Sequence, residues 1–211
     1  MTGLAPHLRA TAEAYDAAAV LYADFVRNAL DDLPLDRSVL TAFAELVRAA
    51  GGGPVAELGC GPGQVTAYLR DLHLDVSGVD LSPALIGLAR QAYPDLRFEI
   101  GSMDRLDLPD ATLAGIVSWY SVIHAPPREL PKYLAEFCRV LQPGGIFLLA
   151  FFESEGGPVT AFDHRVVTAY RWPVDGLAAL ARRAGFTELG RMLREPQEGE
   201  RFRRGHLWMH A

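Results

Sequence analysis

A glycine-rich segment that follows a short apolar run has the clearest chemical meaning in this sequence. The run Val55–Leu58 leads into Gly59, Gly61 and Gly63, and a helical pattern follows. Glycine is needed where the backbone adopts a positive φ or where a ligand lies against the main chain. The first turn of the next helix offers unpaired N–H groups to a polar ligand. The segment therefore predicts a loop that binds a small polar molecule.

Two common nucleotide-binding patterns do not fit this loop. The dinucleotide pattern G-x-G-x-x-G would need a glycine at Gln64 or Thr66. A phosphate-binding P-loop would need a lysine, and the only lysine in the chain is Lys132. The pattern that remains is E-x-G-x-G-x-G, which begins with Glu57. Asp80 ends the next strand pattern, where a carboxylate can accept hydrogen bonds from the hydroxyl groups of a ribose.

Strand and helix patterns alternate over the segment that must position these residues. From Val55 to Phe152 five apolar strands are expected, with helices between them, and this order is typical of a parallel sheet covered on both faces. Two further strands, Phe186–Leu193 and Gly205–His210, have no helix between them and predict a closing hairpin. Apolar residues at helical spacing predict two helices before the sheet. The expected fold class is α/β, a doubly wound sheet of seven strands, mostly parallel with one antiparallel strand near the C-terminus, plus N-terminal helices.

Length and composition narrow the class of protein. The 211 residues suffice for one domain with a sizeable core, because half of them are hydrophobic. The formal net charge of −6 weighs against a nucleic-acid partner. The longest apolar run, Ile146–Phe152, is too short to span a bilayer, and no signal peptide is recognisable. With only Cys60 and Cys138 and no zinc-type spacing, we expect a cytoplasmic protein without a structural metal.

In order and spacing these motifs resemble the class I S-adenosylmethionine-dependent methyltransferases. The resemblance runs from Val55 to the C-terminus, and Glu57–Gly63 is similar to the family's glycine motif. The segment Glu136–Gly145 is similar to the family's helix and turn before the fifth strand. The resemblance implies a Rossmann-like fold that binds S-adenosyl-L-methionine and releases S-adenosyl-L-homocysteine. The most similar members are the small ubiquinone-biosynthesis-like enzymes that methylate small molecules.

The resemblance also assigns roles to residues at the carboxyl ends of the strands. The glycine loop would lie under the methionine part of the cofactor, and Asp80 would bind the ribose. Ser102 stands where the family usually has an acid, so Asp104 or a backbone carbonyl is expected to recognise the adenine amino group. The cofactor-binding residues implied in this way are Glu57, Gly59, Cys60, Gly61, Gly63, Asp80, Leu81, Ser82, Gly101, Ser102, Met103, Trp119, Tyr120 and Tyr15.

A histidine beyond the fourth strand is the main candidate for a catalytic group. His124 follows that strand at the edge of the sheet where ligands bind in this architecture, and it either acts as a base or shapes the loop.

Tyr15 and Tyr22 share one helical face, either over the cofactor or packed on the sheet. Tyr22 is a second catalytic candidate. Surface or strand positions are expected for the remaining histidines outside the long loop, His7, His73, His206 and His210.

The remaining segments are assigned to the acceptor of the methyl group. Residues 1–50 are predicted to form a helical cap, and residues 51–211 the core on which it packs. Cap and core together form a single domain. Within the core, residues 153–174 read as a long loop on the substrate side. Its mixture of aromatic and polar groups suits a small, partly apolar molecule. The expected acceptor contacts are His164, Tyr170 and Trp172.

The predicted function is methyl transfer to such a molecule in small-molecule or secondary metabolism, with an O, N or C acceptor. A protein that binds S-adenosylmethionine without methyl transfer, and a macromolecule methyltransferase, are the alternatives. Amino-methylating DNA enzymes carry [DNS]-P-P-[FYW] at the end of the fourth strand, where this chain has Ser118–Ser121. We therefore expect a small-molecule partner, no nucleic acid and no membrane, and a monomer or homodimer.

Overall fold

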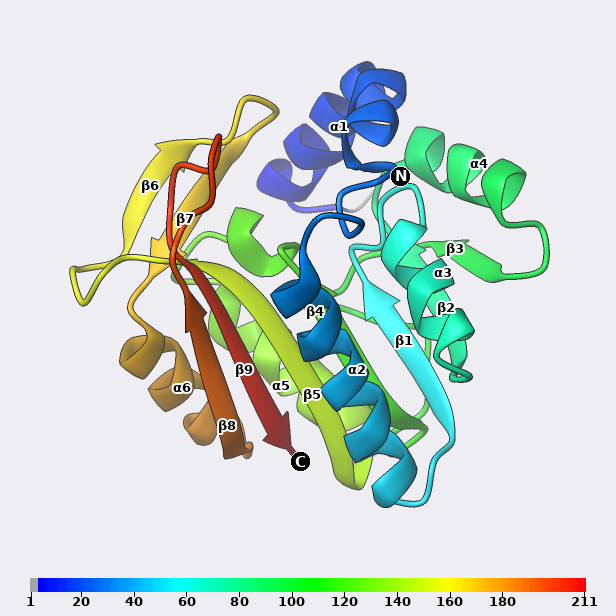
Figure 1. Cartoon of the computed structure of the whole chain (residues 1–211), viewed down its shortest axis with the longest axis vertical. Helices are drawn as coiled ribbons and strands as arrows, with labels where there is room; N and C mark the ends of the chain where they lie inside the picture. The colour runs from blue at the N-terminus through cyan, green and yellow to red at the C-terminus, as the bar shows by residue number, and fades with distance from the viewer. Residues whose placement is uncertain (1–3) are drawn as a thin grey trace.

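A nine-stranded sheet with helices on both faces forms the centre of the computed structural model, which describes residues 4–211 (Figure 1). The strands are β1 (Pro54–Leu58), β2 (Asp75–Asp80), β3 (Arg97–Ile100), β4 (Leu113–Trp119), β5 (Leu141–Glu153), β6 (Thr160–Asp163), β7 (Thr168–Trp172), β8 (Thr187–Arg194) and β9 (Arg204–His210). The helices are α1 (Pro6–Val26), α2 (Pro34–Ala49), α3 (Gln64–Asp71), α4 (Pro83–Ala92), α5 (Leu130–Val140) and α6 (Val174–Arg183), with a 3₁₀ turn η1 at Val122–His124.

The order of the strands reverses beside β1, and this reversal determines where a ligand can bind. The strands lie in the order β3-β2-β1-β4-β5, all parallel, so the chain moves outward from β1 in one direction and from β4 in the other. In such sheets ligands bind at the carboxyl ends of the strands beside the reversal. β9 pairs with β5 in the antiparallel sense, and β8 pairs with β9. The predicted α/β class and closing hairpin are confirmed.

The segment predicted to be a long loop contains a hairpin instead. β6 and β7 pair in the antiparallel sense, and β7 joins the last two residues of β5, Phe152 and Glu153. The sheet therefore has nine strands rather than the seven predicted. Asp163 initiates the turn, since its carboxylate accepts a hydrogen bond of 2.7 Å from the Arg165 N–H. The strands were missed because their alternation is weak, with Ala169 and Trp172 the only buried side chains in β7.

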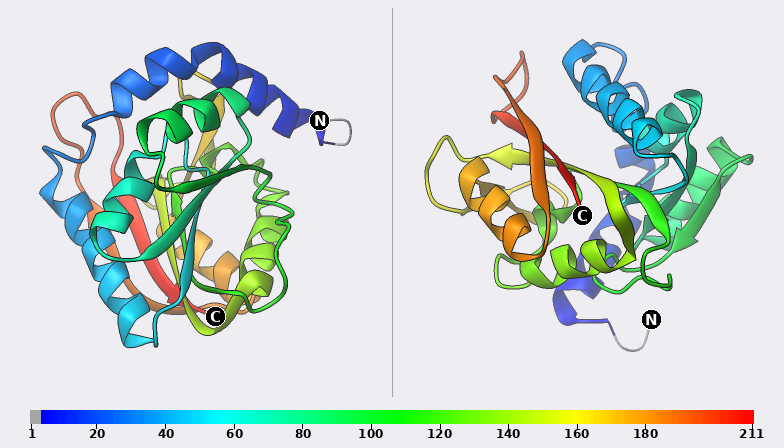
Figure 2. Two further views of the ribbon diagram at one scale, coloured as in Figure 1. Left: turned by 90° about the vertical axis from the view of Figure 1, so that its right-hand side faces the viewer. Right: turned by 90° about the horizontal axis from the view of Figure 1, so that it is seen from below.

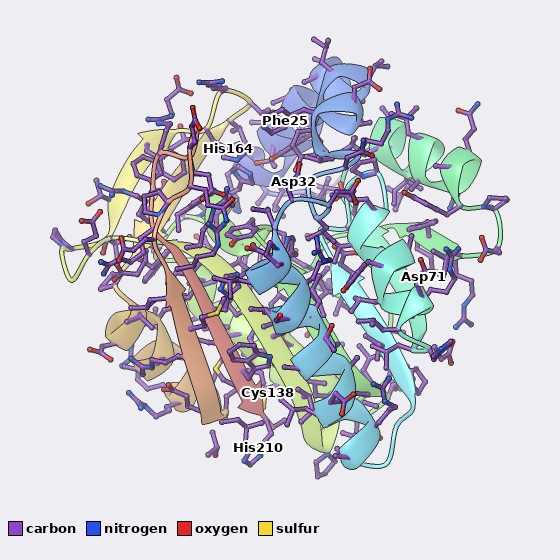
Figure 3. The ribbon with its side chains drawn as sticks, in the orientation of Figure 1. Phe25, Asp32, Asp71, Cys138, His164 and His210 are labelled. Atoms are coloured by element: carbon purple, nitrogen blue, oxygen red, sulfur yellow. The ribbon has the colours of Figure 1, made fainter. Side chains whose placement is uncertain are left out.

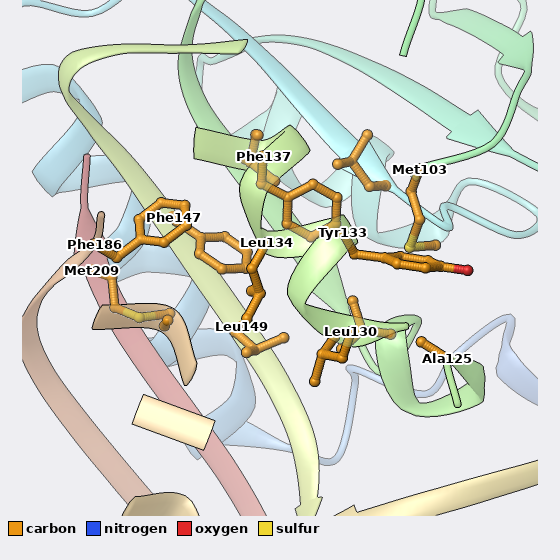
Figure 4. Close-up of a cluster of buried hydrophobic side chains, with 14 of the residues drawn as sticks. Met103, Ala125, Leu130, Tyr133, Leu134, Phe137, Phe147, Leu149, Phe186 and Met209 are labelled. Carbon is orange, nitrogen blue, oxygen red and sulfur yellow. The ribbon is translucent and has the colours of Figure 1, made fainter. Parts of the chain in front are cut away.

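The two faces of the sheet carry separate apolar clusters. On one face α5 and α6 pack against the sheet through Phe137, Phe147 and Leu177, all fully buried. On the other face α2 and α3 pack through Phe43 and Leu69. Figure 2 shows these two layers, with α1 lying across the end of the molecule opposite to the C-terminus. Figure 4 shows Tyr133 and Met103 at one edge of the first cluster.

Local sequence signals fix several helix starts. Ser82 caps α4 by accepting a hydrogen bond of 3.1 Å from the Leu85 N–H, and Pro83 follows in the first turn. Asp175 is of a residue type that often caps a helix, but it does not cap α6. The cap position is Pro173, and Asp175 lies in the first turn, where its carboxylate binds Arg191 at 2.6 Å.

A buried ionic network joins α2 to the closing hairpin. Arg194 contacts Asp36 at 2.8 Å and Glu200 at 2.7 Å, and the side chains of Arg194 and Asp36 are only 3% and 2% exposed. Arg204 contacts Glu200 at 2.9 Å. Buried charges are tolerated when they are paired in this way. The network fixes the start of β9 beside α2.

Two classes of feature are not seen between Leu4 and Ala211. No helix there is both long and apolar enough to cross a membrane. In the same range, histidine, cysteine and acidic side chains form no group of three that could hold a metal ion.

The close packing of β9 on β5 predicts a pair of contrasting glycine substitutions. A Cβ at Gly205 would lie 2.4 Å from the ring of Phe151, which is fully buried, whereas a Cβ at Gly190 would meet nothing within 4 Å. We expect Gly205→Ala to lower the free energy of unfolding by about 1–3 kcal/mol through overpacking. Gly190→Ala should change it by less than about 0.5 kcal/mol. Urea denaturation measures both, and equal effects would contradict the packing described here.

Candidate functional site

A cavity lies at the carboxyl ends of β1, β2 and β4, beneath α1. Its empty volume is about 680 Å³, which includes the space at its open mouth. Elements from both sides of the strand-order reversal meet in its wall. The lining residues are His7, Leu8, Thr11, Ala12, Tyr15, Tyr22, Gly59, Gly61, Asp80, Leu81, Ser82, Leu85, Met103, Trp119, Tyr120, Ser121, His124, Ala125 and Tyr133.

The glycine loop after β1 forms the floor of the cavity. Gly59 has a φ of 76°, and a Cβ there would lie 2.3 Å from the Cβ of Ser121, so no other residue fits. Gly61, with a φ of 54°, faces Tyr22 on α1, whose ring carbon would be 3.6 Å from an added Cβ. The loop thus exposes bare backbone to the cavity between β4 and α1.

Asp80, at the end of β2, ties the glycine loop to the start of α4. One carboxylate oxygen accepts a hydrogen bond from the Gly61 N–H and the other from the Ser82 N–H, both at 2.8 Å. Each carboxylate oxygen has two lone pairs, so each keeps one for a ligand in the cavity. Burial raises the pKa of Asp80, and the two backbone hydrogen bonds oppose that shift. The arrangement suits a pair of neighbouring hydroxyl groups as donors.

Glu57 and Cys60 lie behind the loop and do not line the cavity. The carboxyl group of Glu57 accepts a hydrogen bond from the hydroxyl of Thr66 on α3. Burial raises the pKa of Glu57 to about 8, so the group is largely neutral at pH 7. Burial also raises the pKa of the Cys60 thiol. Both residues support the loop from below.

Helix α1 forms the roof of the cavity and is tied to α4 by Asp16. One carboxylate oxygen of Asp16 accepts hydrogen bonds from the Ser82 hydroxyl at 2.5 Å and from the Ala84 N–H at 3.0 Å. Asp16 therefore caps α4 from a different helix, beside the residue that Asp80 also binds. This contact fixes the height of the roof over the glycine loop.

His124 presents an unprotonated ring nitrogen toward the roof. Its Nδ1 lies 3.0 Å from the carbonyl oxygen of Thr168, which can only accept, so Nδ1 carries the proton. The Nε2 then accepts a hydrogen bond of 2.8 Å from the Tyr15 hydroxyl. Burial lowers the pKa of His124 to about 4, so the ring is neutral at pH 7. A neutral, oriented imidazole of this kind can take up a proton.

Tyr120, directly after β4, adopts an uncommon backbone conformation at the cavity wall. Its φ is 53°, in the left-handed region that costs free energy for residues other than glycine. Its hydroxyl lies 3.1 Å from Nε2 of His206 on β9, and the guanidinium of Arg204 lies 4.7 Å from its ring centroid. Burial lowers the pKa of His206 to about 3, so this partner is neutral. These contacts hold the Tyr120 ring against the cavity.

The structure brings most but not all of the predicted residues together. Met103, Trp119 and Leu81 line the cavity, whereas Gly101 and Ser102 do not. The Ser102 hydroxyl donates instead to Asp104, whose other oxygen binds Lys132 at 2.6 Å. The predicted acceptor contacts likewise divide into two groups, which the positions of β6 and β7 explain.

Of the predicted acceptor contacts, only His164 approaches the cavity wall. Its ring lies 5.1 Å from that of His124 and edge-on to it, and Figure 3 labels it on the side of the hairpin that faces α1. Trp172 is buried in the core at 5% exposure, and Tyr170 packs against the same cluster. Neither residue reaches the cavity.

Several lining residues were not predicted. His7 was assigned to surface or strand positions, but it lines the roof, 3.4 Å from the Tyr133 hydroxyl. The spacing of His7, Thr11 and Tyr15 places them on one helical face, so extending the stripe from Tyr15 would have found the first two. Ser121, whose hydroxyl donates to the Leu58 carbonyl at 2.5 Å, had no sequence signal.

Comparisons with known proteins agree with this geometry. A family model described as a methyltransferase domain matches residues 55–145, which include the glycine loop and end within β5. The crystal structure of Burkholderia thailandensis 1,6-didemethyltoxoflavin-N1-methyltransferase, with bound 1,6-didemethyltoxoflavin and S-adenosylhomocysteine, is 27% identical. The structural alignment covers 100% of this chain and 92% of the Burkholderia thailandensis chain, with a TM-score of 0.68. Residues 55–145 therefore match the methyltransferase-domain family, and the chain as a whole is similar to class I S-adenosylmethionine-dependent methyltransferases.

Curated relatives share only part of their length with the chain. A probable S-adenosylmethionine-dependent methyltransferase from Mycolicibacterium smegmatis is 29% identical over 150 residues, which are 68% of this chain and 56% of the relative. An S-adenosyl-L-methionine-dependent Diels-Alderase from Talaromyces variabilis is 34% identical over 131 residues, 57% of this chain and 44% of the relative. The chain spans about half the length of these relatives.

The capping of α4 by α1 predicts the effect of removing Asp16. In Asp16→Ala the Ala84 N–H loses its partner, and we expect a loss of about 0.5–2 kcal/mol, as for other helix caps. Amide hydrogen exchange should become faster along α1 and in the first turn of α4. Asp24→Ala is the matched control, because Asp24 lies on the same helix, is exposed and pairs only with Arg27. Unchanged protection of α1 in Asp16→Ala would contradict the contact.

Proposed function

We propose that the protein transfers a methyl group from S-adenosyl-L-methionine to a small, partly apolar acceptor. The observation that carries this proposal is the presence, in one cavity, of Asp80 beside a bare glycine loop and of a neutral His124. The relative from Burkholderia thailandensis, which was crystallised with a small acceptor and S-adenosylhomocysteine, supports it.

The residues of the cavity fit this cofactor. Asp80 keeps two lone pairs for the ribose hydroxyls, and the exposed backbone of Gly59 and Gly61 allows close approach of the amino-acid part. Leu81 and Leu85 offer apolar surface for an adenine ring beside Asp80. The assignment of individual residues to parts of the cofactor is part of the proposal. When bound, the cofactor supplies an electrophilic methyl group on a sulfonium.

On this proposal His124 removes the proton from an acceptor hydroxyl or amine. The acceptor takes the place of the Tyr15 hydroxyl at Nε2, its proton passes to that nitrogen, and the lone pair on the acceptor atom becomes available for the new bond to carbon. The Thr168 carbonyl keeps the ring oriented through Nδ1 and stabilises the imidazolium that forms. Alignment of the acceptor beneath α1, with water excluded, supplies the larger part of the acceleration.

Tyr22 is better suited to positioning than to proton transfer on this proposal. Burial and, to a smaller extent, the nearby Asp80 and Glu57 together raise its pKa to about 12, so the phenol keeps its proton at pH 7. Its ring lies against Gly61 and edge-on to Tyr15, with centroids 5.1 Å apart. It therefore closes the roof over the glycine loop.

A protein that uses the cofactor without methyl transfer is the second candidate. The Talaromyces variabilis Diels-Alderase, at 34% identity, is the observation that favours it. A screen with cofactor labelled in its methyl group separates the two, because only a methyltransferase moves the label to a small acceptor. The expected restriction to small molecules rather than nucleic acids, the monomeric or dimeric state, the cytoplasmic location and a role in secondary metabolism stay predictions.

Cofactor binding is expected to depend on Asp80. In Asp80→Ala we expect the affinity for S-adenosylhomocysteine to fall by about 1.5–3 kcal/mol, the scale of hydrogen bonds to a charged group. Isothermal titration calorimetry measures the loss, and thermal unfolding confirms that the variant is folded. Asp75→Ala is the control, because Asp75 lies at the opposite end of β2 in an exposed pair with Arg97. A folded Asp80→Ala protein with unchanged affinity would remove Asp80 from the site.

The ionisation of His124 gives a prediction on pH. Nuclear magnetic resonance titration should find the pKa of His124 near 4, well below the ordinary value of 6.5. Above this pKa the one remaining ring proton should be on Nδ1. The folded state disfavours the charged ring. The contribution of the neutral His124 ring to the stability of the folded state is therefore complete above about pH 6.5 and is lost as the pH falls toward about 4.

In His124→Ala turnover should fall roughly 10²-fold. A titration near pH 6.5 would contradict the effect of burial described here, and an unchanged turnover would contradict the role of base.

A further inference from the structure

Three arginines and four aromatic rings gather where the β6–β7 hairpin meets the connection between β8 and β9. The guanidinium of Arg171 lies 4.4 Å from the ring centroid of Phe202, and that of Arg201 lies 4.9 Å from the same centroid. Arg204 lies 5.0 Å from Phe152. We call this group the arginine cluster, comprising Arg171, Arg201, Arg204, Tyr120, Phe152, Phe162 and Phe202.

Two of these arginines have no acidic partner. Across residues 4–211 no carboxylate lies within 4.0 Å of Arg171 or Arg201, whereas Arg204 pairs with Glu200. Among the residues that the structure describes, Arg201 donates only to the Asp163 carbonyl, at 2.8 Å. The Nε atoms of Arg171 and Arg204 and the Nδ1 of His164 are shielded from solvent without a hydrogen-bond partner in the described part of the chain. The terminal nitrogens of Arg171 also have no hydrogen-bond partner in that range and, unlike its Nε, they are not shielded from solvent, so they are available to an anionic acceptor.

The arginine cluster is continuous with the wall of the cavity. Tyr120 belongs to both, and its ring centroid is 5.2 Å from that of Phe152. From Phe152 the rings continue to Phe202 at 6.1 Å, and His164 lies 6.2 Å from Phe152 and 5.1 Å from His124. In Figure 1 the hairpin and the β8–β9 connection lie side by side and face α1 across this end of the molecule. This row of rings leads from the wall of the cavity beside His124 to the arginines.

The charge of the arginine cluster is felt at the cavity wall. Burial lowers the pKa of His164, and the guanidinium groups of Arg204 and Arg201 lower it further, while Asp163 opposes them. Asp163 is exposed and spends one carboxylate oxygen on the Arg165 N–H. Glu200 is shared between Arg194 and Arg204. The positive potential is therefore only partly balanced, on a chain whose formal net charge is −6.

We infer that the methyl acceptor is a flat molecule bearing an anionic carboxylate or phosphate group, which the arginine cluster binds while the body of the molecule reaches His124. This inference rests on the proposed function. A guanidinium that stacks on a ring uses its π face and keeps the N–H groups at its edge, where a carboxylate or phosphate accepts them in the plane. The rings provide the apolar surface for the body of the acceptor. Such a site also attracts anions from solution and rejects neutral analogues of the same shape.

The experiment compares an acid with its neutral counterpart. Binding of 1-hydroxy-2-naphthoate, its carboxamide and 1-naphthyl phosphate is measured by calorimetry, with and without saturating S-adenosylhomocysteine. We expect the acid or the phosphate to bind at least about tenfold more tightly than the amide. The stronger of the two anions identifies the group that the cluster prefers. In Arg171→Gln and Arg201→Gln that advantage should fall about tenfold, with binding of the amide unchanged.

Matched variants and a second ligand keep the test specific. Arg165→Gln is the control, because Arg165 lies exposed in the turn of the same hairpin and contacts no ring of the cluster. Thermal unfolding verifies that each variant is folded. Equal binding of acid and amide, or no binding of either anion, would overturn the inference even when S-adenosylhomocysteine binds normally. Failure to bind S-adenosylhomocysteine would instead count against the proposed function. The binding of acid and amide is then compared in the absence of S-adenosylhomocysteine.

Discussion

The hydrogen bonds of Asp80 are the interaction on which the candidate site depends. They join the loop after β1 to the turn after β2, two segments that are neighbours only because the sheet is parallel and reverses beside β1. Without them the bare backbone of Gly61 would have no fixed position relative to α4. A buried carboxylate that accepts two N–H groups is stabilised locally, and its remaining lone pairs are directed by the same contacts. Structure and binding capacity therefore share one side chain.

The residues that could be predicted are those whose identity depends on local backbone geometry. Gly59, Ser82 and Asp80 are each required by a turn or a helix start, so their meaning can be read from neighbouring positions. Helical spacing likewise placed Tyr15 and Tyr22 on one face. The β6–β7 hairpin was missed because short strands at the end of a sheet bury few side chains and leave a weak alternation.

Contacts made across the fold could not be read in this way. The pairing of His124 with the Thr168 carbonyl depends on where the hairpin returns along β5, and no residue type at position 168 is required for a backbone acceptor. Asp16 caps a helix 68 positions further along the chain, so no local pattern marks it as a cap. Trp172 is of a residue type that often contacts small molecules, but its position in β7 directs its side chain into the core. Sequence reasoning finds the groups, and topology decides which of them meet.

The N-terminus of α4 is bound by two carboxylates, and this has a consequence for the exchange of bound molecules. Asp16 on the roof and Asp80 on the floor both bind Ser82, so the roof cannot lift from α4 without leaving the first turn of that helix short of acceptors. Release of a product through this side would be coupled to fraying of α4. Opening at the opposite side, between α1 and the hairpin, breaks the hydrogen bond between Tyr15 and His124 but leaves the cap of α4 intact. We therefore expect the roof to stay anchored at α4 and to open along the edge where no helix end depends on the contact.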